Sequence, residues 1–173
     1  MKNFILTSLF AMMIPLAACT ASEGVDNSPI KTPFVLERYL GTWYEIARYD
    51  HSFERDVNHA TAVYAMRDDG KVAVVNSGWK NGKVKSSVGK AKTTRIPAVL
   101  KVSFFGPFYS EYRILMLTPD YQYAVVGSSS SRYLWILSRT PQVPPAVQDA
   151  IMAEIHRRGY DTSDLIWVDQ SFN

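Results

Sequence analysis

Short runs of alternating side chains, separated by residues that favour turns, recur along the chain from residue 41 onward. A period of two places every second side chain on the same face, so each run predicts a half-buried β-strand. Asn81-Gly82 suits a two-residue hairpin, because both residues tolerate positive φ. The other turn signals are Asp68-Asp69-Gly70, Gly106-Pro107, Pro119-Asp120 and the serine run 128–131. The predicted strands cover residues 42–50, 59–67, 71–79, 83–93, 98–105, 109–118, 121–128 and 132–139.

The pattern changes after Pro144-Pro145, which suit the start of a helix. Val147, Ile151 and Ile155 then fall on one helical face, and residues 165–168 predict one more short strand. The predicted fold class is therefore all-β. The spacing of the strands is that expected of an antiparallel sandwich or barrel. The architecture predicted is an eight-stranded up-and-down antiparallel barrel with one C-terminal α-helix packed outside and a short final strand. A barrel of eight strands encloses an interior just wide enough for one small ligand.

Length and charge argue for one domain and against several classes of function. The 173 residues suffice for a single domain with a sizeable core. The formal charge of +3 falls to +2 without Lys2 and is dispersed, so no nucleic-acid partner is predicted. His51, His59 and His156 stand on different predicted elements without ligand spacing, so no metal site and no cofactor are predicted. The sequence contains no nucleophile elbow, phosphate-binding loop or dinucleotide fingerprint.

The first 18 residues have the layout of a secretory signal peptide, with an early lysine, an apolar run and small residues at the end. Cys19 follows and is the only cysteine, so the mature fold has no internal disulfide. The run Leu16-Ala17-Ala18-Cys19 resembles the bacterial lipobox, in which the signal is cut before the cysteine and the thiol is acylated. The alternative is a buried free cysteine beside an ordinary cleavage site.

Acyl chains on Cys19 would anchor the protein in a membrane. Thr20 occupies the position where, in the lipoproteins that this leader resembles, an aspartate retains the protein in the inner membrane. The outer membrane is therefore the expected location. The predicted segments are a lipoprotein signal peptide (1–18), a lipidated cysteine with a flexible tether (19–33) and the barrel domain (34–173).

Gly41-Thr42-Trp43 opens the first predicted strand with a bend and an indole. Pro119-Asp120-Tyr121 lies between two later strands, and Arg139 ends the last long run. This set, in this order and followed by a helix, resembles the lipocalin family, and more closely its bacterial lipoprotein branch and apolipoprotein D. The resemblance covers residues 33–168. It implies that Arg139 lies across the Trp43 indole and that Gly41, Trp43 and Arg139 form a structural plug at the closed end of the barrel.

Alternation on the last long strand places Tyr133, Trp135 and Leu137 on the same face as Arg139. Because the resemblance puts Arg139 inside the barrel, these side chains are predicted to face the interior. The same reasoning applies to the first and seventh strands. The candidate pocket residues are Trp135, Tyr133, Leu137, Ala47, Glu45, Tyr123 and Val125. For Trp135 and Tyr133, core filling and pocket lining are equal alternatives.

Two features leave alternatives open. Glu45 is predicted to face inward, where a carboxylate needs a partner, and Arg113, another inward residue or water would serve. Phe104-Phe105-Gly106-Pro107-Phe108-Tyr109 concentrates four aromatic residues around one hairpin. A patch of this kind is typical of a contact surface, so a lid, a membrane-contacting rim and a homodimer contact stand beside simple packing.

The resemblance and the compartment together imply a membrane-anchored protein that stores or transports a lipophilic molecule. The implied ligand is a fatty acid or lysophospholipid, and the implied location is the periplasmic side of the outer membrane, reached through acylated Cys19. No catalytic residue is predicted. One alternative is a lipid-modifying envelope enzyme, in which Glu45 and a nearby tyrosine act as an acid–base pair. Another is a structural envelope protein whose barrel is filled with side chains.

Overall fold

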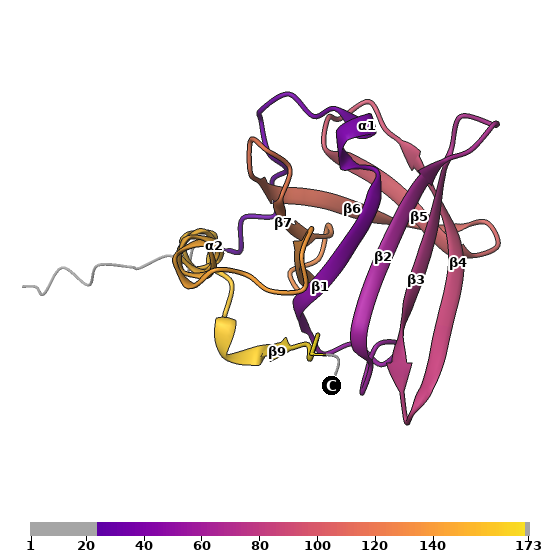
Figure 1. Ribbon diagram of the computed structural model, residues 1–173. Helices are drawn as coiled ribbons and strands as arrows, with labels where there is room; N and C mark the ends of the chain where they lie inside the picture. The colour runs from indigo at the N-terminus through magenta and orange to yellow at the C-terminus, as the bar shows by residue number, and fades with distance from the viewer. Residues whose placement is uncertain (1–23, 172–173) are drawn as a thin grey trace, which may run out of the picture.

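The computed structural model describes residues 24–171, and in it the predicted meander of strands closes into a barrel (Figure 1). The barrel strands are β1 (Gly41–Tyr49), β2 (Asn58–Met66), β3 (Val72–Lys80), β4 (Lys83–Thr93), β5 (Val99–Phe105), β6 (Phe108–Leu117), β7 (Tyr123–Gly127) and β8 (Leu134–Ser138). Each strand pairs antiparallel with the next, and β1 pairs with both β2 and β8. The predicted fold class is therefore confirmed, and each predicted strand ends within two residues of its observed bounds.

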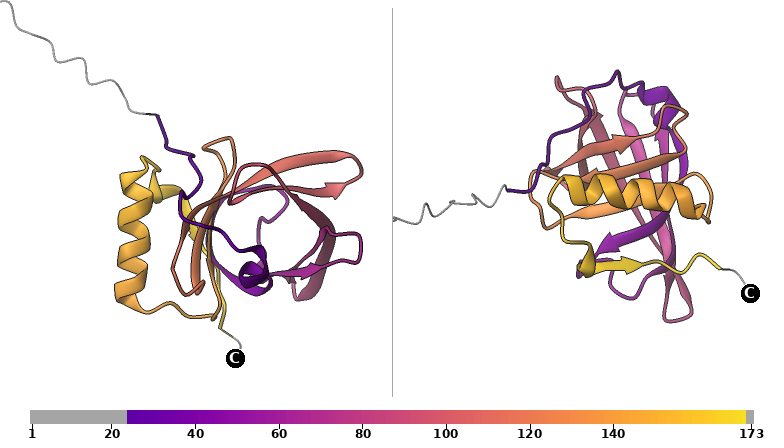
Figure 2. Two further views of the ribbon diagram at one scale, coloured as in Figure 1. Left: turned by 90° about the horizontal axis from the view of Figure 1, so that it is seen from above. Right: turned by 90° about the vertical axis from the view of Figure 1, so that its left-hand side faces the viewer.

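A helix and a ninth strand lie outside the barrel (Figure 2). Helix α2 (Pro145–Arg157) packs Ile151 and Ile155 against the barrel wall, as their spacing predicts. After the 3₁₀ turn η1 (Thr162–Asp164), strand β9 (Leu165–Trp167) pairs with the second half of β1. The sequence patterns do not predict the short helix α1 (Leu36–Tyr39), because a single turn is too short to show a helical period. It lies at the end of the barrel where β1 begins.

Two turns need the left-handed backbone that their residues favour. In the β3–β4 hairpin, Asn81 has φ 53° and Gly82 has φ 70°. At Gly41, φ is 95°, and an added Cβ would lie 3.4 Å from the guanidinium of Arg139. Such φ values strain a side-chain-bearing residue much more than glycine. These residues therefore set the register of β3 with β4 and the direction in which the chain leaves α1.

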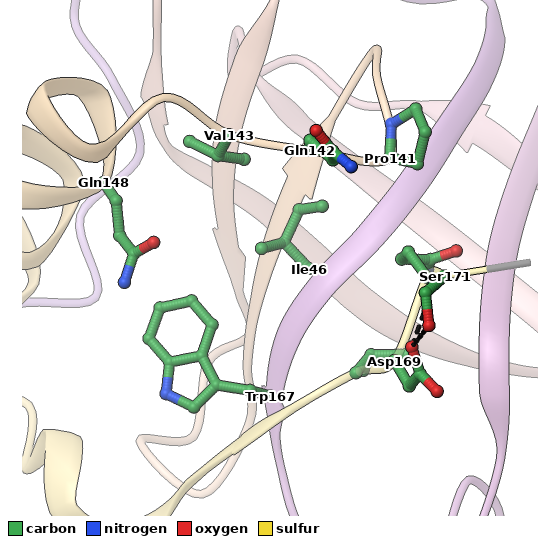
Figure 3. A pocket seen from close by; sticks show the side chains of 10 residues that line it. Ile46, Pro141, Gln142, Val143, Gln148, Trp167, Asp169 and Ser171 are labelled. Carbon is green, nitrogen blue, oxygen red and sulfur yellow. Dashed lines mark hydrogen bonds between the residues drawn. The ribbon is translucent and has the colours of Figure 1, made fainter.

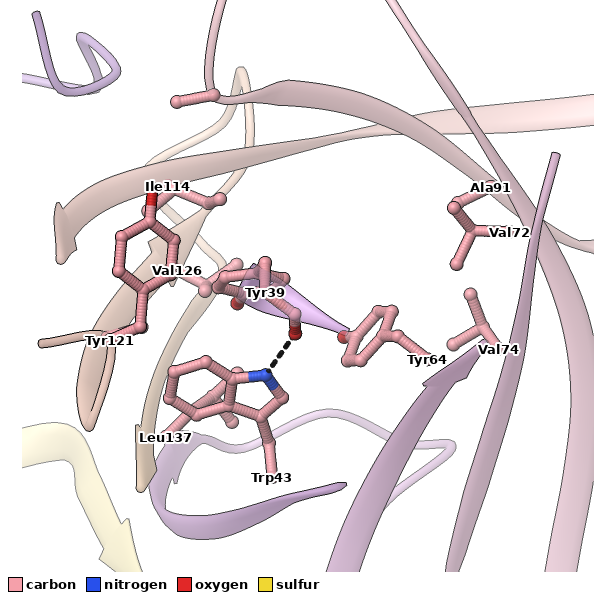
Figure 4. Packing of buried hydrophobic residues seen from close by; sticks show 12 residues of the cluster. Tyr39, Trp43, Tyr64, Val72, Val74, Ala91, Ile114, Tyr121, Val126 and Leu137 are labelled. Carbon is pink, nitrogen blue, oxygen red and sulfur yellow. Dashed lines mark hydrogen bonds between the residues drawn. The ribbon is translucent and has the colours of Figure 1, made fainter. Parts of the chain in front are cut away.

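Buried side chains form two clusters, one inside the barrel (Figure 4) and one beneath α2. The inner cluster contains Tyr39, Trp43, Tyr64, Val72, Val74, Ala91, Ala98, Ile114, Tyr121, Ala124, Val126 and Leu137. The outer cluster contains Ile46, Ala47, Leu115, Val125, Leu134, Ile136, Ile151, Ile155 and Tyr160. The strands under α2 are thus buried on both faces. On the opposite side of the barrel, Trp79, Val84 and Val88 remain exposed.

The segment before α1 is attached to the barrel. The N–H of Asp26 donates to the carbonyl of Arg158 (2.8 Å), and the N–H of Ile30 donates to the carbonyl of Ile114 (2.9 Å). Val25 also packs against the outer cluster. These contacts correct the flexible tether predicted for residues 19–33, because the segment is attached to the barrel from Val25 onward. Its polar composition suited a linker, but the backbone groups are used in contacts with the barrel. The signal peptide and Cys19 lie outside the described residues.

The wall between β1 and β2 is completed by the C-terminal tail. These two strands pair only along 41–44 of β1. Beyond that point, backbone groups of residues 168–169 bond to both strands. The side-chain amide of Gln170 also bridges them, donating to the carbonyl oxygens of Glu45 and Ala60, each at 2.8 Å. The tail therefore closes the barrel where the β1–β2 ladder ends.

Candidate ligand-binding site

One end of the barrel is closed by Trp43 and Arg139. The guanidinium carbon of Arg139 lies 3.9 Å from the centroid of the indole, a cation–π contact. Its Nη1 and Nη2 donate to the carbonyls of Thr42 (2.8 Å) and Arg38 (2.9 Å). The indole Nε1 donates to the carbonyl of Tyr39 at 2.8 Å (Figure 4). The side-chain donors of Trp43 and Arg139 are thus bonded to backbone carbonyls, and the two side chains close this end of the barrel.

Strand β8 turns its predicted face inward. Trp135 and Leu137 pack in the inner cluster, and Tyr133 stacks on Trp135 with 6.0 Å between ring centroids. Leu137 is buried, whereas Tyr133 and Trp135 keep accessible surface. Leu137 therefore fills core near the plug, and the two rings lie toward the other, open end.

Three predicted pocket residues, Ala47, Tyr123 and Val125, instead pack in the outer cluster beneath α2. For Ala47 the reason is a β-bulge, since the β1–β8 register shifts between Glu45 and Ala47. An extra residue in one strand reverses the alternation of its side chains. For Tyr123 and Val125 the reason is a turn. Tyr121 has φ 61° and precedes β7, so alternation counted from it does not continue into the strand. The predicted inward direction of these three residues is wrong.

The inner face is fully buried near the plug but only partly buried toward the open end. Val102, Phe104, Tyr112 and Trp135 pack on the inner cluster and still keep accessible surface. A side chain inside a closed barrel keeps accessible surface only where other side chains do not fill the interior. These residues therefore line space inside the barrel, and most of that lining is aromatic.

Three phenols bond to one another in the interior. The hydroxyl of Tyr112 lies 2.6 Å from that of Tyr39 and accepts a hydrogen bond from Tyr64 at 3.0 Å. Burial raises the pKa of Tyr39, Tyr64 and Tyr112. The three groups stay neutral at physiological pH, so they add hydrogen-bonding capacity without charge.

A charged cluster lies inside the barrel near the open end. Arg48 is 2% exposed, and its Nη1 donates to Oε1 of Glu45 at 2.6 Å. Its Nη2 donates to the carbonyls of Glu54 (2.6 Å) and Val57 (3.0 Å) in the β1–β2 loop. The Glu54 carboxylate accepts a hydrogen bond from the Trp135 indole at 3.0 Å. One buried arginine and one indole thus tie the β1–β2 loop to the barrel.

The two carboxyls of this cluster have raised pKa values. Burial, and then the charge of Glu54, raises the pKa of Glu45 to about 8, against the opposing effect of Arg48. Burial also raises the pKa of Glu54. With a pKa of about 8, the Glu45 carboxyl is largely protonated at neutral pH although it is bonded to Arg48. The cluster therefore carries little net charge there.

His51 lies in a stack of rings at the same end. Its ring centroid is 4.8 Å from that of Trp135, 5.0 Å from that of Tyr133 and 5.2 Å from that of Phe53. Burial, and then the charge of Arg48, lowers the pKa of His51 to about 4. The imidazole is therefore neutral at physiological pH.

Two hollows adjoin the barrel. One, of about 250 Å³, lies outside it between α2 and β9, where Gln148 and Trp167 flank it (Figure 3). The other, of about 700 Å³, lies at the open end and includes Arg48 of the interior cluster. Its lining residues are Arg48, Asp50, Arg55, Asp56, Asn58, Asn81 and Ile166. The open end of the barrel therefore has a polar mouth next to an aromatic interior.

The aromatic side chains of the β5–β6 hairpin lie on both sides of the barrel wall. Phe104 faces inward over Gly89, where an added Cβ would lie 2.7 Å from the ring. Phe105 and Phe108 are 82% and 78% exposed. Packing thus accounts for Phe104, whereas Phe105 and Phe108, which are paired across the hairpin, remain largely exposed.

Residues 24–171 contain no cluster of His, Cys, Asp and Glu that is arranged to hold a metal ion. Within the same residues, no helix is long and apolar enough to cross a membrane.

Sequence reasoning missed Arg48, His51 and Glu54. Unbroken alternation placed Arg48 outside, and the bulge that turns it inward has no signature in the local sequence. The partner of Glu45 is accordingly Arg48, whereas Arg113 bonds to Glu111. The spacing of three residues between Glu45 and Arg48 was the one available signal, but in a regular strand it separates side chains onto opposite faces.

A barrel that is plugged at one end and accessible at the other is the architecture of a protein that encloses one small ligand. The Lipocalin-like domain model matches residues 34–170, and the chain belongs to the lipocalin family. It is 45% identical over 159 residues to the outer membrane lipoprotein Blc of Escherichia coli K12, covering 90% of each chain. It is 30% identical over 156 residues to apolipoprotein D of Mus musculus, covering 84% of this chain and 82% of that protein. Insecticyanin from the tobacco hornworm Manduca sexta shares the fold, with a TM-score of 0.70 at 22% identity, over 84% of this chain and 85% of the insecticyanin chain.

Proposed function

We propose that this protein binds a long-chain lipid, a fatty acid or lysophospholipid, inside its barrel and stores or transports it at the periplasmic face of the outer membrane. The observation that carries the proposal is the set of inward yet accessible side chains, Val102, Phe104, Tyr112 and Trp135. The location is supported by similarity to a protein named outer membrane lipoprotein. Acylation of Cys19 and a homodimer remain predictions. A lid, a membrane-contacting rim and a dimer contact remain the alternatives for the hairpin that carries Phe104, Phe105 and Phe108.

The energetics of an acyl chain fit such an interior. Burying sixteen carbons contributes on the order of 10 kcal/mol before the costs of ordering. Loss of translational and chain freedom reduces this to an affinity of about micromolar. No chemical step is needed for such a function.

The test replaces Trp135 by phenylalanine and titrates palmitate into both proteins. In the parent protein the acyl chain displaces water near the indole, so the tryptophan fluorescence shifts on binding. Trp79 and Trp167 are 43% and 46% exposed on the outer surface and respond little. We therefore expect Trp135→Phe to lose most of the fluorescence change. An unchanged signal in the variant would show that Trp135 does not line the site, and absence of lipid binding to the parent contradicts the proposal itself.

No observation favours a second function over this one. Glu45, whose carboxyl a lipid-modifying enzyme would use, is 7% exposed as a residue, and that carboxyl is already bonded to Arg48. A structural protein without ligand would need a filled interior, whereas side chains inside this barrel keep accessible surface.

A further inference from the structure

Two buried polar atoms at the open end have no hydrogen-bond partner among the residues that the structure describes. They are Nε of Arg48 and Nε2 of His51. The residues are 2% and 5% exposed, so bulk water does not replace the missing partners. An unsatisfied buried donor costs its full desolvation penalty, and native proteins contain few of them. Both atoms therefore point to a partner that is not part of the folded chain.

The two atoms belong to side chains that meet at Trp135. In the β1–β8 ladder Arg48 is the direct partner of Trp135, so the two side chains share a face. The His51 ring centroid lies 4.8 Å from the indole. Arg48 also lines the hollow of about 700 Å³ at the open end. Hydrogen-bond donors and an aromatic wall thus lie together, and Arg48 also borders a hollow that is large enough for a head group.

The charges around Arg48 suit an anion. Glu45 on β1 and Glu54 in the β1–β2 loop both have a raised pKa, so at neutral pH they do not present two fixed negative charges. His51 in the same loop and Tyr64 on β2 are neutral. Three charged side chains also line the hollow beside Arg48: Asp50 and Arg55, which form an ion pair with each other, and Asp56. An anion beside Arg48 favours the protonated carboxyls further, so its binding is accompanied by proton uptake.

From this geometry we infer that Arg48 and His51 hold the anionic oxygens, carboxylate or phosphate, at the head of a single-chain lipid. The Nε–H of Arg48 donates to one oxygen, and His51 donates to another in the tautomer that carries its proton on Nε2. Trp135 packs against the first carbons, and the chain runs inward toward Phe104 and Tyr112. The inference rests on the proposed lipid-binding function and adds the chemistry by which the head is recognised.

The experiment compares two lipids of sixteen carbons, palmitate and 1-hexadecanol, by isothermal titration calorimetry at neutral pH. Arg48→Lys keeps the positive charge but lacks Nε, and His51→Phe keeps the stacked ring but lacks both nitrogens. We expect palmitate affinity to fall about tenfold in Arg48→Lys and about threefold in His51→Phe, with hexadecanol changed by less than about twofold. His156→Phe, the same exchange on the outer surface of α2, is the matched control and should bind both lipids as the parent does.

A third probe, 1-palmitoyl lysophosphatidic acid, separates the two sources of anionic oxygen. Tighter binding than palmitate assigns the site to phosphate, weaker binding assigns it to carboxylate, and in either case Arg48→Lys must weaken the preferred lipid.

Equal weakening of palmitate and hexadecanol in His51→Phe, or no change of palmitate in either variant, overturns the inference and leaves the proposed function standing. If near-ultraviolet circular dichroism shows that Arg48→Lys does not fold, His51→Phe decides alone. A parent protein that binds none of the three lipids overturns both proposals.

Discussion

The direction of a single side chain, Arg48, determines much of the chemistry at the open end. A bulge one residue long turns it from the outer wall to the interior, where it bonds to Glu45 and to the β1–β2 loop. A buried arginine needs such partners, because the desolvation of its charge is otherwise uncompensated. The same burial keeps Glu45 protonated to a higher pH than an exposed glutamate.

Glu45→Gln tests this consequence through stability. The folded pKa of Glu45 is about 8, above the ordinary value of 4.5, so between these values the folded state binds more protons than the unfolded state. The contribution of the protonated group is fully present below about pH 4.5 and is lost progressively as the pH rises through about 8. A glutamine cannot ionise. We therefore expect urea denaturation to show that the parent loses about 1–3 kcal/mol more than Glu45→Gln between pH 5 and pH 8.5.

Glu37→Gln, at an exposed position on α1, is the control and should follow the parent at every pH. If the parent and Glu45→Gln lose stability in parallel over this range, Glu45 is already ionised in the folded protein at pH 5, which contradicts the prediction.

At the scale of elements, the unusual feature is a barrel wall completed by a tail. The β1–β2 ladder ends at Tyr44, and an unpaired strand edge inside a wall would leave backbone groups without partners. Gln170, which is 9% exposed, supplies part of the missing bonds with one amide group that donates to both strands.

Gln170→Ala should therefore destabilise the protein by about 1–3 kcal/mol, the cost of leaving buried carbonyls unsatisfied. It should also speed amide hydrogen exchange at residues of β1 and β2 next to the tail, because the wall opens locally there. Denaturant melts and exchange measured by NMR check the two effects. Gln142→Ala, at an exposed position, should show neither. A loss below about 0.5 kcal/mol for Gln170→Ala, within the range of ordinary surface changes, means that the tail does not close the wall.

At the scale of the whole molecule, the fold and the predicted membrane anchor are separate. The chain is bonded to the barrel from Asp26 onward, and Cys19 lies outside the described residues. The acyl chains predicted on Cys19 would hold the barrel close to the membrane, because only residues 20–24 lie between them and the barrel contacts, which begin at Val25.

Cys19→Ser should release the protein from the outer membrane without loss of fold, since the cysteine precedes every contact described in the barrel. Membrane fractionation measures the release, and circular dichroism of the released protein measures the fold. Retention of the variant in the outer membrane would show that acylation at this position is not the anchor.

The barrel could be predicted because its signals are local. Alternation, Asn81-Gly82 and the helical face of α2 each follow from neighbouring residues, and each is found as expected. The candidate site could be predicted only in part. Trp135 and Leu137 face inward because β8 is regular from Leu134 to Ser138, so alternation counted from Arg139 holds along it.

The sequence by itself determined the fold class and the strand order, since repeated alternation and turn residues act within short stretches. The plug of Gly41, Trp43 and Arg139 was expected only through the resemblance to a family, because it joins residues far apart in the chain. Tertiary structure alone decided that Ala47 faces outward and Arg48 inward, and that Glu54 from a loop reaches the Trp135 indole. A bulge arises from pairing between β1 and β8, strands separated by most of the chain. Its presence depends on how the barrel closes, and no local pattern of side chains encodes it.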